Sequence, residues 1–199
     1  MCIRDRTYTG SLSWSEGITG TPGSPWLSEG TALSWEVTAN SNGTFTYWYQ
    51  LTVAATPGIS HLMIEVSPSF TADNILDVLQ GSLAQQQPEV ANPSSNSNPG
   101  MPSAMNALKF ENTSALTWTV EFVSDRTPVW GDFYAKGGAV QSGLGAIWNA
   151  GYGNPDVDPM DPPANGSVEF HLLVPDTTVI IPVPGALGLA VLGLSLIHI

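Results

Sequence analysis

Residues 44–53 read TFTYWYQLTV, with apolar side chains at every second position from Phe45 to Val53. A period of two sustained over ten residues is typical of a β-strand that buries one face. The dipeptide Asn42-Gly43 just before this stretch is a turn signal, and a second β-type run occupies residues 32–38. We therefore expect residues 32–38 and 44–54 to form a β-hairpin.

Similar runs recur along the chain between clusters of Gly, Pro, Asn and Ser. They occupy residues 8–14, 61–66, 116–123, 129–135 and 168–174. In one of them, Leu116, Trp118, Val120 and Phe122 alternate with mostly polar residues, as in a half-exposed strand. The pattern predicts an all-β fold: a single antiparallel, jelly-roll-like β-sandwich over residues 7–175, with long loops.

Two kinds of segment interrupt the β-pattern. Residues 71–79 (TADNILDVL) predict a short helix with Thr71 as its N-cap, ended by Gly81. Residues 85–102 and 154–165 are rich in Pro, Asn and other polar residues, and they predict long surface loops.

The last part of the chain is an apolar tail. Residues 179–194 carry no charged side chain, and Pro182, Val183 and Pro184 stand near its start. The run that follows consists of Gly185, Ala186, Leu187, Gly188, Leu189, Ala190, Val191, Leu192, Gly193 and Leu194. Because a spanning helix needs about 20 apolar residues, we expect residues 176–194 to contain a truncated hydrophobic helix. The alternative is a C-terminal strand or core helix of a soluble protein.

Both ends of the sequence resemble translated sequencing-adapter DNA. The final residues LSLIHI and the first residues MCIRD match the two strands of a transposase-type adapter. We therefore treat residues 1–6 and 195–199 as artefacts of assembly and expect the gene to be truncated at both ends.

The charge balance is strongly acidic. The chain holds five Lys+Arg and seventeen Asp+Glu, a net charge of −12. Setting aside Arg4, Arg6 and Asp5 leaves three cations and sixteen acids, a net charge of −13. Such a chain is unsuited to nucleic acid, which needs clustered cations, and it suits an exported protein kept soluble by self-repulsion. The one cysteine, Cys2, lies in the adapter-like end, so we expect no disulfide.

Candidate sites for chemistry are few. His61 and Glu65 lie four residues apart on one predicted strand and His171 lies on another, which could form half of a metal or acid/base site. The alternative is that these are ordinary strand residues whose polar groups are satisfied. No phosphate-binding loop, nucleophile elbow or HExxH motif occurs.

Residues 125–136 (DRTPVWGDFYAK) hold two of the three remaining cations beside three aromatic residues. One interpretation is a ligand patch for carbohydrate or a partner, with Trp130 and Tyr134 as stacking platforms and Arg126 as a hydrogen-bonding fork. The alternative is that Arg126 pairs with a neighbouring acid to fix a loop while the aromatic residues fill the core.

Asp156, Asp158 and Asp161 lie in the loop NPDVDPMD and offer the hard oxygen ligands that Ca²⁺ prefers. Calcium is therefore a possible cofactor, although the loop lacks the glycine and terminal Glu of an EF-hand. The alternative is a solvated, proline-rich loop, and we expect no other cofactor.

Several stretches of the chain resemble one group of PEP-CTERM proteins. They are SHLMIEVS at 60–67, the loop 96–102 leading into Leu108-Lys109-Phe110, SDRTPVWGDFYAKGG at 124–138, HLLVPDTT at 171–178, and Pro182-Val183-Pro184 with the apolar run after it. Val183 stands where the signal's name has Glu. The resemblance implies export, retention in the inner membrane of a Gram-negative bacterium, and processing by an exosortase-type protease in cells that make exopolysaccharide.

Two functions follow as expectations. The first is a non-enzymatic protein of the cell surface or extracellular matrix, anchored in the inner membrane before exosortase processing. The second is a secreted carbohydrate-binding module or a hydrolase that acts on polysaccharide. Two facing carboxylates in a cleft would favour the hydrolase, and an exposed aromatic strip would favour the binding module.

Overall fold

The computed structural model describes residues 6–66, 68–83, 88–93, 97–111, 114–138, 145–153 and 158–175. Within these ranges the chain forms thirteen strands and one turn of 3₁₀ helix. The elements are β1 (Thr7–Ser13), β2 (Ile18–Gly20), β3 (Ala32–Ala39), β4 (Phe45–Thr52), β5 (Ile59–Glu65), η1 (Ala72–Asn74), β6 (Ile75–Gln80), β7 (Glu89–Ala91), β8 (Met105–Glu111), β9 (Thr117–Ser124), β10 (Pro128–Gly131), β11 (Phe133–Gly137), β12 (Ala146–Asn149) and β13 (Leu172–Pro175).

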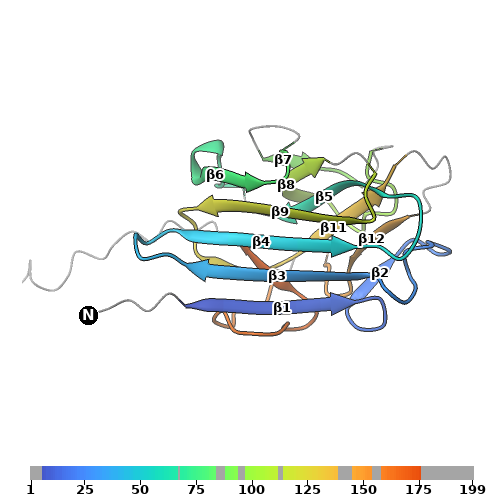
Figure 1. Cartoon of the computed structure of the whole chain (residues 1–199), viewed down its shortest axis with the longest axis horizontal. Helices are drawn as coiled ribbons and strands as arrows, with labels where there is room; N and C mark the ends of the chain where they lie inside the picture. Colours follow the sequence, from blue (N-terminus) through green and yellow to red (C-terminus); the bar gives the residue numbers. More distant parts are fainter. Residues whose placement is uncertain are drawn as a thin grey trace, which may run out of the picture.

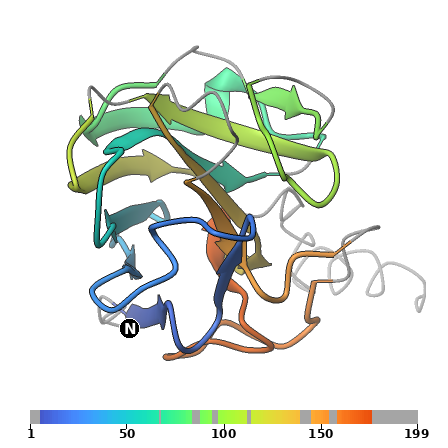
Figure 2. The ribbon, with the colours of Figure 1, turned by 90° about the vertical axis from the view of Figure 1, so that its right-hand side faces the viewer.

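The strands form two large sheets and one small one, and their pairs are antiparallel. The first sheet has the order β1-β3-β4-β9-β6 and faces the viewer in Figure 1. The second has the order β2-β12-β11-β5-β8-β7 and lies behind it, as the turned view in Figure 2 also shows. The small sheet is the pair β10-β13. The prediction of an all-β sandwich is confirmed.

Two strand pairs, one in each large sheet, are nested in the sequence. β5 pairs with β8 in the six-stranded sheet. The strand before β5, which is β4, pairs with the strand after β8, which is β9, in the five-stranded sheet. The consecutive strands β4 and β5 thus pair with β9 and β8 in two different sheets, which is the kind of nesting found in a jelly roll.

The predicted hairpin is present. β3 and β4 pair over their whole lengths from Ala32↔Thr52 to Ala39↔Phe45. Gly43, in the turn, has a φ of 86°, a conformation that glycine adopts without strain. Tyr47 and Tyr49 point into the core with the Phe122 ring, at centroid distances of 5.4 Å and 6.3 Å. The alternation in residues 44–53 thus reflects one buried face.

Apolar side chains gather on both faces of the six-stranded sheet. The larger cluster fills the space between the sheets, with Trp26, Trp35, Trp130, Phe110 and Leu33 fully or almost fully buried. A smaller cluster contains Met63, Met101, Met105 and Tyr134 and packs against Trp148 and Tyr152. Residues 97–105 and 145–153 contribute to this second cluster, so the outer face of this sheet is covered.

Part of the predicted secondary structure is wrong. In place of the helix predicted at residues 71–79, the chain forms one 3₁₀ turn, η1, and then the strand β6, which pairs with β9. The Asn74 side chain accepts from the Thr71 N–H at 2.9 Å and closes this turn. Beyond it, strand pairing satisfies the backbone, and Ile75 and Val78 pack on the core. Tertiary contacts therefore override local helix propensity.

Other boundaries also differ from the prediction. The run 129–135 splits at Asp132 into β10 and β11, which belong to different sheets. Of the run 168–174, only Leu172 onward is strand. The loop predicted at 85–102 contains β7 and buries Asn98 and Met101, because these residues cover the second apolar cluster. The predicted C-terminal helix lies outside the described residues.

Candidate functional site

Three ionisable side chains converge where the chain passes between the sheets. Asp132 lies between β10 and β11, and His171 directly precedes β13; Gly131↔Leu172 pairing of β10 with β13 brings the two together. His171 Nε2 lies 3.5 Å from Asp132 Oδ1 and 3.8 Å from Asp158 Oδ1. Asp132 and His171 are buried, whereas the Asp158 side chain is 35% exposed. We call Asp132, Asp158 and His171 the carboxylate–histidine cluster.

Two neighbouring side chains, Glu65 and Asn149, hold Asp132 in place. Its backbone N–H donates to Glu65 Oε2 at 2.8 Å, and its Oδ1 accepts a short hydrogen bond from Asn149 Nδ2. Asn149 Oδ1 in turn accepts from the Phe133 N–H at 3.0 Å. A Cβ at Gly131 would lie 2.9 Å from Glu65 Oε2, so this glycine leaves room for the carboxylate. Asp132 is therefore held from two strands, β5 and β12.

A tight turn presents His171. The His171 N–H donates to Val168 O at 2.9 Å, and the two residues between them, Glu169 and Phe170, have φ of 49° and 65°. Two positive φ values inside such a turn are typical of type I′, which favours Asn and Gly rather than Glu and Phe. His171 Nδ1 lies 3.2 Å from the Val168 carbonyl, which can only accept, so Nδ1 is the donor.

Of the three residues of the predicted metal or acid/base site, the structure brings two together and places the third elsewhere. Glu65 and His171 lie on either side of Asp132, a residue that the sequence alone did not single out for this role. His61 lies elsewhere, paired in register with Lys136 and 6.0 Å from the Tyr134 ring. Burial, and then the charges of Lys109 and Lys136, lower the His61 pKa to about 3. His61 is therefore neutral at physiological pH.

The residues of the predicted calcium loop fall in different places. Asp156 lies outside the described residues. Asp158 belongs to the carboxylate–histidine cluster, and Asp161 is exposed. His171 therefore lies beside Asp158. An imidazole nitrogen among the ligands suits a transition metal better than calcium, which prefers oxygen ligands.

The ligand patch predicted at Arg126, Trp130 and Tyr134 is wrong, because these side chains are buried. Trp130 lies in the core between the sheets and Tyr134 in the second apolar cluster, since the chain changes sheet at Asp132. Burial raises the pKa of the Tyr134 hydroxyl, which donates to Pro99 O at 2.9 Å. The aromatic rings cannot serve as a stacking surface.

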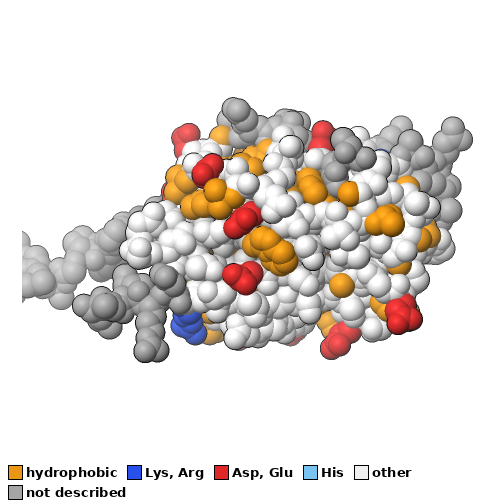
Figure 3. All heavy atoms as spheres, in the orientation of Figure 1, with side chains coloured by type: hydrophobic (Ala, Val, Ile, Leu, Met, Phe, Trp, Pro, Cys, Tyr) orange, Lys and Arg blue, Asp and Glu red, His pale blue; other side chains and the backbone are white. Residues whose placement is uncertain are grey.

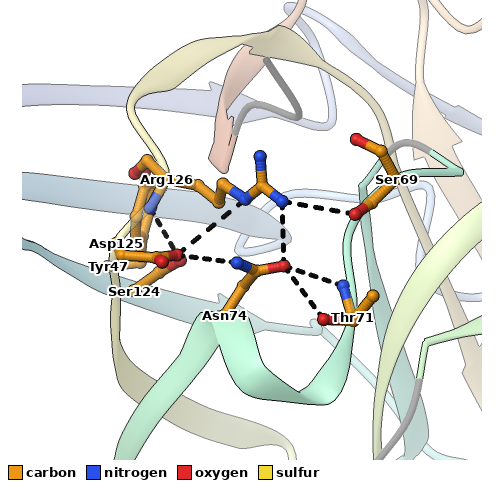
Figure 4. A network of polar contacts seen from close by, with 7 residues as sticks. All are labelled: Tyr47, Ser69, Thr71, Asn74, Ser124, Asp125 and Arg126. Carbon is orange, nitrogen blue, oxygen red and sulfur yellow. Dashed lines mark hydrogen bonds and ion pairs between the residues drawn. The ribbon is translucent and has the colours of Figure 1, made fainter. Parts of the chain in front are cut away.

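Arg126 instead fixes a loop, as the alternative interpretation held. Its Nη2 donates to Ser69 O at 3.2 Å and to Asn74 Oδ1 at 3.1 Å, and its Nε lies 3.8 Å from Asp125 Oδ1 (Figure 4). Asn74 Nδ2 also donates to Asp125 Oδ1 at 3.0 Å. This Arg126 network (Ser69, Thr71, Asn74, Asp125 and Arg126) joins the turn after β9 to η1.

The outer face of the five-stranded sheet is polar and has a shallow hollow of about 340 Å³. The hollow is lined by Glu36, Thr38, Thr46, Trp48 and Glu121. Glu36 and Glu121 flank Trp48 in register on the two neighbouring strands. Figure 3 shows acidic side chains beside hydrophobic ones over the middle of this face. The alternation that buries Tyr47 and Tyr49 turns Trp48 outward, so the sequence did contain the signal for this face.

The residues of the predicted sorting segment, Pro182 to Leu194, lie outside the described residues. Within the described ranges, no helix is long and apolar enough to cross a membrane. Comparisons of the chain with protein-family models, with curated proteins and with solved structures found no match.

Proposed function

We propose that this chain is a non-enzymatic protein of the cell surface or extracellular matrix of a Gram-negative bacterium. The observation that carries this proposal is the triplet Pro182-Val183-Pro184 followed by an uncharged run to Leu194. An exosortase-type protease is the proposed partner, with the inner membrane holding the precursor. The net charge of −12 agrees with an exported protein and disfavours nucleic acid as a partner.

The packing of the sandwich supports a role without catalysis. The densest group of unusual side chains in the sequence has structural roles. Arg126 belongs to the Arg126 network, and Trp130 and Tyr134 pack in the apolar clusters. Glu36 and Glu121 lie on the two strands that flank Trp48, which is in register with both and separates them. The polar outer face is suited to contact with the exopolysaccharide layer.

Expression of the complete gene in an exosortase-containing bacterium and in its exosortase deletion strain tests the sorting proposal. An epitope tag fits in the exposed turn at residues 41–43, because loop tips tolerate insertion. In the parent strain the protein should be processed and reach the cell surface. In the deletion strain, and after Pro182→Ala with Pro184→Ala, the precursor should accumulate in the inner membrane.

The double variant Pro162→Ala with Pro163→Ala is the matched control, because it removes two prolines from the loop before β13. It should be processed like the parent protein. A precursor that is freely soluble, or processing that is unchanged in the deletion strain, would refute the proposal.

A carbohydrate-binding module is the second candidate, and the half-buried Trp48 in the outer hollow favours it. An indole ring offers a flat apolar platform, while threonine hydroxyls and the two carboxylates offer hydrogen-bonding groups. Because the flanking acids repel anions, a neutral polysaccharide is the suitable probe. In affinity electrophoresis through laminarin or dextran, Trp48→Ala should abolish retardation, and Trp14→Ala, at an exposed tryptophan that does not line the hollow, should not. If the polysaccharide leaves the mobility of the parent protein and of both variants unchanged, this candidate is rejected.

A further inference from the structure

We propose that the carboxylate–histidine cluster binds one divalent transition-metal ion of the zinc type, with Asp132, Asp158 and His171 as ligands. One possible ligand atom from each residue lies within 4.8 Å of the other two. The three residues come from the β10–β11 junction, the loop after Gly153 and the turn before β13, so an ion would join three separate segments.

The His171 ring is oriented as a ligand. Nδ1 donates to the Val168 carbonyl at 3.2 Å, which leaves the lone pair of the neutral ring on Nε2. Metal-binding histidines commonly donate their other ring N–H to a backbone carbonyl in this way. Nε2 is buried, and it has no hydrogen-bond partner among the described residues. It instead faces the Oδ1 atoms of Asp132 and Asp158.

A lone pair that faces two carboxylate oxygens is repelled unless a cation lies between them. The Nε2–Oδ1 distances of 3.5 Å and 3.8 Å are too long for a hydrogen bond through a shared proton. They do suit ligands of one ion, because two atoms about 2.1 Å from a tetrahedral metal lie about 3.4 Å apart. The separation therefore fits a metal better than a proton.

Charge supports the same conclusion. Two carboxylates and one imidazole carry a net negative charge even when the imidazole is protonated. Asp132 is fully buried, where an excess of charge is costly unless a counterion is present. A divalent ion between the three side chains would offset the charge of the two carboxylates.

The ligand set selects the class of metal. Calcium prefers six to eight oxygen ligands, whereas an imidazole nitrogen with two carboxylates suits zinc and similar transition metals. Asn149 and Glu65 hold Asp132, and a Cβ at Gly151 would lie 2.7 Å from the His171 Cε1 atom, so this glycine leaves room for the ring. The partly exposed Asp158 provides the side from which the ion and a water ligand could enter.

Zinc titration of the chelator-treated full chain by calorimetry and thermal melting tests the proposal. We expect one ion per chain and a melting temperature higher by about 5–10 °C when free zinc is 100 times its dissociation constant. Calcium should have little effect. Cobalt should give the visible absorption bands of a four-coordinate site. Asp158→Asn should weaken zinc binding at least tenfold, because the amide is a poorer ligand.

Asp161→Asn is the matched control, since it removes an exposed carboxylate three residues further along the same loop. It should bind zinc like the parent protein, and both proteins retain the other potential ligands of the chain, Cys2 included. Absence of zinc binding, a preference for calcium, or equal zinc affinity of the Asp158→Asn and Asp161→Asn proteins would each overturn the proposal.

Discussion

Arg126 and Asp132 lie six residues apart in the sequence, and each belongs to a polar cluster that connects segments distant in the chain. In the Arg126 network, one cation meets one carboxylate, and amide and carbonyl groups bond to the guanidinium. In the carboxylate–histidine cluster, two carboxylates meet one imidazole. Both clusters are largely buried, so burial alone does not distinguish the structural cluster from the proposed metal site. The two differ in the balance between their positive and negative side chains.

The largest effect should come from Arg126→Met, which breaks the balanced cluster while keeping a long apolar side chain. Asn74 and Ser69 lose their guanidinium partner, so we expect the free energy of unfolding to fall by about 2–3 kcal/mol. Urea denaturation of the metal-free protein measures it. Zinc affinity should stay unchanged, because the network does not include a ligand of the other cluster.

Arg126→Lys is the control for charge. It keeps the cation but loses the planar fork that reaches Asn74 and Ser69 together, so its loss of stability should be intermediate. If Arg126→Met changes the free energy by less than 0.5 kcal/mol, the network is not a stabilising one.

A comparison of the two buried histidines gives the next effect. His171 faces carboxylates, whereas His61 faces Lys109 and Lys136, and its pKa is lowered to about 3 from an unfolded value near 6.5. The unfolded chain thus takes up a proton at His61 before the folded protein does, and stability is lost as the pH falls below about 6.5. His61→Gln should remove about 2 kcal/mol of the loss between pH 7 and pH 5.

Urea denaturation of both proteins at the two pH values gives this difference directly. Every contribution other than that of His61 is common to both proteins and cancels. An equal decline in stability for the parent protein and His61→Gln would show that the folded protein protonates His61 as readily as the unfolded chain.

Asp132→Asn should change stability in the opposite direction from Arg126→Met. In the metal-free protein it removes one of two like charges, and the amide oxygen can still accept from Asn149 Nδ2, so we expect a gain of about 1 kcal/mol. Asp125→Asn, in the balanced network, should instead lose about 0.5–1 kcal/mol. Chemical denaturation with chelator present measures both; a loss for Asp132→Asn would contradict the charge argument.

The sequence predicted the sandwich because its signal is local. Alternation in residues 44–53 and the Asn42-Gly43 turn are readable without any tertiary contact, and they specify β3, β4 and the face that each side chain occupies. The same reading fails at residues 71–79, where a good helix start is followed by pairing with β9, a strand more than forty residues away.

The carboxylate–histidine cluster was only partly predictable for the same reason. Glu65 and His171 stood out together as part of a metal or acid/base site, whereas Asp158 stood out separately in the predicted calcium loop. What joins them is Asp132, placed by the change of sheet after Gly131 and by the pairing of β10 with β13. That pairing spans some forty residues, and no spacing in the sequence reveals it.

The last effect, similar in size to that of Asp132→Asn, should come from the turn that presents His171. Phe170 has a φ of 65° and a side chain that is 44% exposed, so its backbone is strained while its ring is only partly buried. Phe170→Gly and Phe170→Ala both remove the ring, but only glycine, which has no Cβ, adopts positive φ without a steric clash. The glycine variant should therefore be more stable than the alanine variant by about 1 kcal/mol. Equal stability in urea would mean that the turn relaxes without cost, and unequal zinc affinity would mean that the strained backbone itself sets the position of the imidazole.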